Sequence, residues 1–129
     1  MNPPVDLKDH ASALRGLETD TQIFDILGNL RRRTIVRYMG LLETTVAVSM
    51  TELARVCAAV ERKLPVNQID HSAYRHAYQS IRSRDIPRLE SAAVLERESR
   101  DTIYRGETFG RFEQILSEIE PVFRGEQPT

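Results

Sequence analysis

Apolar residues recur at intervals of three and four along most of this chain, the spacing that gathers side chains on one face of an α-helix. The first such run contains Ile23, Phe24, Leu27 and Leu30, and Asp20 is placed to cap its first turn. Gly28 and Asn29 interrupt the pattern. A second run over residues 31–43 has Ile35, Met39 and Leu42 on one face. The two runs predict either one bent helix or two separate helices.

A short strand and a third helix are predicted next. Residues 44–49 are rich in β-branched side chains, which favours a strand. Ser49 and Glu52 have the spacing of a capping box, in which each side chain bonds to a free amide of the first helical turn. The helix that begins there is predicted to reach about Lys63, with Leu53, Val56, Cys57 and Val60 inward. Pro65 prevents its continuation, so residues 65–70 are predicted to form a turn.

Residues 71–92 predict a long helix with two unlike faces. Its apolar sector contains Tyr78, Ile81, Ile86 and Leu89, and its opposite face contains His76, Gln79, Ser80, Ser83 and Arg84. Pro87 lacks an amide donor and crowds the carbonyl four residues earlier, so a kink or a new helix start is expected near residues 84–86. Arg82 falls towards the apolar side. Either it extends its charged end into solvent, or it pairs with a carboxylate, or the helical phase is wrong.

The last third of the chain predicts a hairpin and a helix. Residues 94–98 and 102–105 read as two strands joined by Ser99, Arg100 and Asp101. An apolar stripe at helical spacing follows, ended by Pro121, and comprises Phe109, Phe112, Ile115, Leu116 and Ile119. This stripe either packs on its own domain or pairs with a second copy in a twofold dimer.

The order of these elements predicts a mainly α fold with a small β-hairpin, arranged as a winged helix-turn-helix. Residues 1–19 are expected to be a flexible leader and residues 20–106 the domain. Residues 107–124 would form the amphipathic C-terminal helix, and residues 125–129 a tail. A chain of 129 residues fits one domain of this kind.

Charge is unevenly distributed, although the whole chain has a formal net charge of only −1. Residues 29–88 contain eleven basic and five acidic side chains, a net charge of +6, whereas the flanking segments carry −3 and −4. A local basic segment is the electrostatic pattern expected of a surface that contacts phosphate.

Four segments resemble a family of uncharacterised winged-helix domains that is abundant in halophilic archaea and related in layout to MarR-like and arsenic-repressor-like regulators. They read IFDILGNLRRRTIVRYM, MTELARVCAAVE, YQSIRSRDIPRLESAAVLE and TIYRG, within residues 23–106. Members of that family usually carry histidine where this chain has Asp85, and glycine where it has Ala93. An acidic side chain at position 85 would repel phosphate. The resemblance implies a winged-helix fold, an archaeal source and, by analogy only, a regulatory function.

These features together predict a cytoplasmic, homodimeric transcriptional regulator that binds double-stranded DNA. The expected DNA contacts are Arg75, His76, Gln79, Ser80, Ser83 and Arg84 on the long helix, Arg31, Arg32, Arg33 and Arg37 on the second helix, and Arg100 in the hairpin. The four arginines of the second helix could equally form a solvated face. The expected dimerisation residues are Phe109, Phe112, Ile115, Leu116 and Ile119. The alternative is a winged helix that binds a protein partner and not DNA.

Other function classes find little support in the sequence. The three histidines and single cysteine lack the spacing of a metal site, so no metal or cofactor is expected. Neither a glycine-rich phosphate loop nor a nucleophile motif is present, and an enzyme is not expected. The apolar runs are too short to span a membrane, and Cys57 is expected to be a small buried hydrophobic residue.

Overall fold

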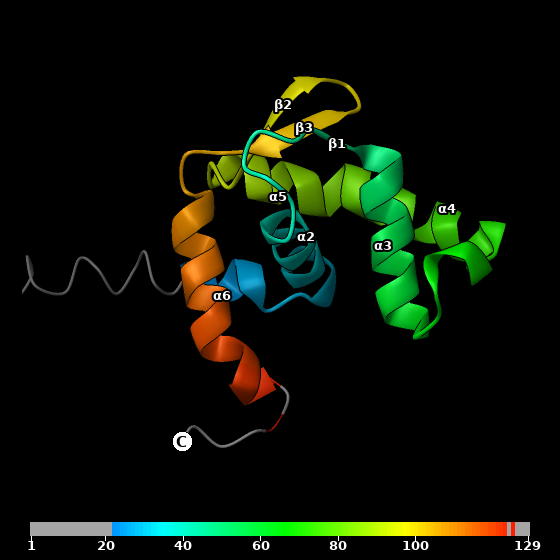
Figure 1. Cartoon of the computed structure of the whole chain (residues 1–129), viewed down its shortest axis with the longest axis horizontal. Coiled ribbons are helices and arrows are strands. Elements are labelled where there is room, and N and C mark those ends of the chain that lie inside the picture. Colours follow the sequence, from blue (N-terminus) through cyan, green and yellow to red (C-terminus); the bar gives the residue numbers. More distant parts are fainter. Residues whose placement is uncertain (1–21, 124, 126–129) are drawn as a thin grey trace, which may run out of the picture.

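The computed structural model of the chain describes residues 22–123 and 125. These residues are mainly helical, with a small antiparallel sheet at one end (Figure 1). The predicted leader, the cap at Asp20 and residues 126–129 lie outside the described residues.

The first two apolar runs form two helices. Residues 22–27 are helical, and α2 spans Leu30–Gly40. The break between them is stabilised by Asn29, whose side-chain oxygen accepts hydrogen bonds from the amides of Arg31 at 2.9 Å and Arg32 at 3.3 Å. An N-cap of this kind satisfies amides that a continuous helix would have bonded internally.

The serine half of the predicted capping box begins the next helix. Helix α3 spans Met50–Arg62, and the Ser49 hydroxyl accepts a hydrogen bond from the Glu52 amide at 3.0 Å. The strand before it is shorter than predicted, because β1 comprises only Val48–Ser49 and only these residues pair with another strand. A short 3₁₀ turn, Val66–Gln68, follows α3 where a turn was expected.

The long helix has an irregular turn in its middle. Helix α4 spans His71–Ser80, a π-helical turn spans Ile81–Asp85, and α5 spans Ile86–Ser91. The Ile86 amide donates to the carbonyl of Ile81, five residues back. Pro87 cannot donate and its ring crowds the carbonyl of Ser83, so a wider turn at this place is the expected response. The predicted kink is therefore a π turn that begins slightly earlier.

The hairpin and the C-terminal helix complete the domain. Strands β2 (Leu95–Ser99) and β3 (Thr102–Arg105) pair with a bulge between Arg97 and Ser99, and β1 joins the other edge of β3 in the order β1-β3-β2. Helix α6 spans Phe109–Phe123 and includes Pro121, which was wrongly predicted to end it. Only two residues of α6 follow Pro121. At this position near the helix end, the missing proline amide costs little more than one hydrogen bond.

The core lies between α2, α3, the α4–α5 helix, α6 and the sheet (Figure 1). Fully buried members from these elements include Ile35, Met39, Leu53, Cys57, Ile81, Leu89, Leu95, Ile103 and Leu116. Three side chains from predicted apolar stripes are instead about half exposed: Phe24, Leu30 and Val60. The apolar faces of their helices are wider than the area that neighbouring helices cover, so these side chains stay in contact with solvent.

Ala93 has a left-handed backbone conformation, with φ of 59°. This region favours glycine, because a Cβ atom crowds the adjacent carbonyl there. The glycine expected at this position by resemblance thus has a structural reason. Ala93 sits in the tight connection between α5 and β2, where its carbonyl accepts the Thr108 amide at 2.9 Å.

Candidate nucleic-acid interface

Helix α4 is placed by its N-cap and by an inner face of small side chains. The Asp70 carboxylate accepts a hydrogen bond from the Ala73 amide at 2.8 Å, which defines the first turn. Ala73 and Ala77 are buried against α3, and their small size lets the two helices pack closely. The opposite side of α4 is left open to solvent.

Three predicted contact residues occupy this open side. Arg75, His76 and Gln79 are exposed, and within residues 22–123 their side chains form no ion pair or hydrogen bond. From His71 to Arg84 the chain contains no acidic residue. The exposed face of α4 therefore presents donors and a positive charge that no nearby carboxylate of its own helix neutralises.

Arg82 belongs to the same face, contrary to the phase expected from a regular helix. It is exposed and, with Tyr74, Arg75, Tyr78 and Gln79, lines a shallow hollow of about 190 Å³. The π turn changes the helical phase between Ile81 and Asp85, so the position predicted to point inward points outward. The third of the explanations left open for Arg82, a wrong phase, is the right one.

Arg55 adds a further cation, which sequence reasoning missed. It lies on α3, and its guanidinium carbon is 5.3 Å from the centroid of the Tyr74 ring. That distance allows a cation–π interaction, which holds Arg55 beside α4. No local motif marks this residue, because the contact joins two helices.

Ser80, Ser83 and Arg84 are less available than their helical positions suggested. The Ser83 hydroxyl donates to the Gln79 carbonyl at 2.7 Å. The Ser80 hydroxyl accepts from Arg31 at 2.6 Å and is 3.3 Å from the Asp85 carboxylate, to which it donates. Arg84 is exposed but its Nε also donates to Asp85 at 3.3 Å.

Asp85 is buried, so the repulsion of phosphate expected from it does not arise at the surface. Its side chain is 0% exposed. It faces Ser80 and Arg84, and the Nε of Arg32 lies 3.8 Å from its carboxylate. Burial lowers the pKa of Arg32, while the neighbouring Asp85 opposes that shift. The carboxylate thus balances charge inside the fold, where it also ties the π turn to α2.

The arginines of α2 mostly have partners inside the protein. Arg31 pairs with Glu61 and Arg37 pairs with Glu120, while Arg33 donates to the Leu27 carbonyl at 2.8 Å. The side chains of Arg31 and Arg32 are only 15% and 13% exposed. Much of the positive charge counted in residues 29–88 is therefore neutralised locally, and α2 does not extend the open basic face of α4.

The hairpin has mixed charge. Arg100 is exposed at its turn, and its side chain forms no ion pair or hydrogen bond with the described residues. Glu96, Glu98 and Asp101 are exposed beside it. Arg105 instead serves the fold, because its Nη2 donates to the carbonyls of Met39 at 2.9 Å and Leu42 at 2.8 Å.

The apolar stripe of α6 packs on its own domain. Phe109, Phe112 and Leu116 are buried in the core, and Ile115 and Ile119 pack against it. The stripe thus packs in cis within this chain, and pairing of α6 with a second copy stays a prediction. The five residues predicted for dimerisation do not form an outward apolar face.

Residues 24–105 match a protein family described as a domain of unknown function, DUF7344, and the chain belongs to this family. The match covers nearly the same residues as the resemblance noted from the sequence. No curated protein and no solved structure matches the chain significantly. Within residues 22–123, no cluster of three or more histidine, cysteine or acidic side chains has the arrangement of a metal site. No helix of this described part has the length and apolar character needed to cross a membrane.

Proposed function

We propose that this domain is a winged helix-turn-helix that binds double-stranded DNA as a transcriptional regulator, with α4 in the major groove. The observation that carries the proposal is the exposed face of α4, where Arg75, Gln79 and Arg82 lie together without an acidic neighbour on that helix. Arginine can bond to the guanine edge and glutamine to adenine, and both also reach phosphate oxygens.

The arrangement of elements supports the same proposal. Helices α3 and α4 are joined by a short turn and pack on each other, as the two helices of a helix-turn-helix do. The β2–β3 hairpin follows α5 and carries Arg100 at its exposed turn, the place of a wing that reaches the DNA backbone. Because the hairpin also carries three exposed acidic residues, we assign most of the affinity to α4 and Arg55.

A protein-binding winged helix is the second candidate. The mixed charge of the hairpin and the internal pairing of the α2 arginines favour it, since a DNA-binding surface is usually basic across the helix and the wing. The two candidates differ in whether the domain binds naked duplex DNA.

Fluorescence anisotropy with a labelled random-sequence duplex, over a series of KCl concentrations, tests the proposal. Affinity is expected to fall steeply as salt rises, because each phosphate contact releases counterions. Arg75→Ala and Arg82→Ala should each reduce the slope of log affinity against log salt by about one. Arg88→Ala is the matched control, because Arg88 lies on α5 and pairs with Asp25 of the first helical segment.

Two results would contradict DNA binding through α4. One is an affinity that does not change with salt. The other is an equal loss of affinity in Arg75→Ala, Arg82→Ala and Arg88→Ala, which would reflect overall charge and not a defined face. Thermal unfolding of each variant by circular dichroism shows whether the fold is intact.

A further inference from the structure

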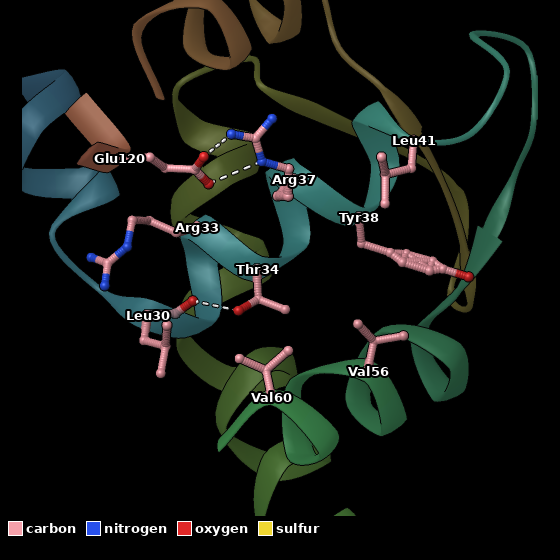
Figure 2. Close-up of a pocket in the computed structure, with 9 residues that line it drawn as sticks. All are labelled: Leu30, Arg33, Thr34, Arg37, Tyr38, Leu41, Val56, Val60 and Glu120. Carbon is pink, nitrogen blue, oxygen red and sulfur yellow. Dashed lines mark hydrogen bonds and ion pairs between the residues drawn. The ribbon is translucent and has the colours of Figure 1, made fainter. Parts of the chain in front are cut away.

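A groove of about 500 Å³ opens between α2 and α3, on residues that take no part in the proposed DNA contact. Figure 2 shows Leu30 and Leu41 on the α2 side and Val56 and Val60 on α3. Leu41 is 79% exposed, and Leu30 and Val60 are 45% and 44% exposed. Apolar side chains left open in a concave site of this size are typical of a ligand pocket.

The polar groups on the α2 wall of the groove are already bonded within the protein. The Thr34 hydroxyl donates to the Leu30 carbonyl at 2.8 Å. Burial and the nearby Glu52 carboxylate raise the pKa of Tyr38, so its hydroxyl keeps its proton and lies beside a carboxylate of the protein itself. An occupant of this part of the groove therefore gains by burying apolar surface and needs few hydrogen-bonding groups there.

One edge of the groove is charged. Arg37 lies there beside Glu120 of α6 (Figure 2), and its Nε donates to the Glu120 carboxylate at 2.9 Å while its Nη2 bonds to the other oxygen. A guanidinium has five N–H donors, so this pairing leaves Nη1 and the outer hydrogen of Nη2 open. The Arg37 side chain is 40% exposed. Its free end matches a second carboxylate in bidentate geometry.

We propose that this groove binds a small amphipathic carboxylate. Its apolar body lies between α2 and α3, against Leu30, Val56 and Val60, and its carboxylate bonds to the open end of the Arg37 guanidinium. Glu120 and the bound carboxylate share one cation, so Glu120 weakens the binding of an anion. This inference does not depend on DNA binding.

The test is an NMR titration of the ¹⁵N-labelled full chain with 4-phenylbutyrate, a small aromatic carboxylate. Two further probes separate the contributions, because 4-phenyl-1-butanol has the same body without charge and acetate has the charge without the body. Saturable shifts in amides of α2 and α3 are expected with phenylbutyrate. The alcohol should bind about fivefold more weakly, and acetate should cause no saturable shift.

Variants assign the two halves of the ligand. Arg37→Gln should lower phenylbutyrate affinity to that of the alcohol and leave alcohol binding unchanged, whereas Glu120→Gln should raise phenylbutyrate affinity. Val60→Gln should weaken both probes. Leu64→Gln is its matched control, since Leu64 is equally exposed at 44% but lies outside the groove.

Three outcomes would overturn the proposal. The first is that phenylbutyrate causes no saturable shifts at the groove. The second is that Arg37→Gln and Glu120→Gln leave the preference for the anion unchanged. The third is that sedimentation shows a dimer that Val60→Gln dissociates and Leu64→Gln does not, because the groove would then hold a second copy of the chain. Thermal unfolding of the variants confirms that each is folded.

Discussion

Replacing Asp85 with alanine removes a carboxylate that solvent does not reach and that faces Arg32, Arg84 and Ser80. The remaining Arg32 side chain is only 13% exposed, so little water is available to replace its counter-charge. Removing one partner from a buried pair typically costs about 3–5 kcal/mol, because the other charge stays buried and unpaired. We therefore expect Asp85→Ala to lower the free energy of unfolding by about 3–5 kcal/mol.

Asp25→Ala is the matched control, because Asp25 also pairs with an arginine but is largely exposed, at 64%. Exposed ion pairs contribute about 0–1 kcal/mol, since water solvates both charges when the pair is broken. Urea denaturation followed by far-ultraviolet circular dichroism measures both variants. A free-energy loss in Asp85→Ala no larger than that in Asp25→Ala would refute the reasoning, as it would mean that Arg32 finds solvent without Asp85.

Three further predictions concern single positions. Burial raises the pKa of Cys57 to about 12, so its thiol should react with Ellman's reagent only after unfolding. The thiol loses its proton near pH 9.0 in the unfolded chain and near pH 12 in the folded one. The contribution of the protonated thiol to the free energy of unfolding is therefore complete below pH 9 and is lost between these two values. In urea titrations, Cys57→Ala should remove this contribution to the loss of stability at alkaline pH. Gly106→Ala should destabilise by more than about 2 kcal/mol, because its Cβ would overlap the Ala93 carbonyl, whereas Gly110→Ala, with open space around it, should stabilise α6 by up to about 1 kcal/mol. Ala93→Gly should raise the melting temperature slightly, since relief of the left-handed strain, about 1–2 kcal/mol, exceeds the added chain entropy; a lower melting temperature would contradict this.

Local structure was largely predictable from the sequence. The Ser49 cap, the start of α3, the hairpin and the irregularity before Pro87 all depend on interactions between residues no more than ten positions apart. Local patterns do not show which surface covers an apolar stripe. The sequence therefore left open whether the stripe of α6 packs on its own domain or on a second copy of the chain.

The candidate site was predicted less completely. Arg75, His76 and Gln79 lie exposed on α4 as expected, because they are far from the π turn and keep the regular helical phase. Arg82 was misplaced by that turn, and Arg55 was missed because its partner ring belongs to another helix.

What the sequence by itself determined was where most helices and strands begin and end, because caps, prolines and residue periodicity act through neighbouring backbone groups. Only the tertiary structure decided which charges are free. Arg31 meets Glu61 thirty positions away, and Arg37 meets Glu120 at a separation of 83. The same packing buries Asp85 and leaves Val60 exposed. Such outcomes depend on which surfaces the folded helices cover, and residue spacing along one helix carries no information about them.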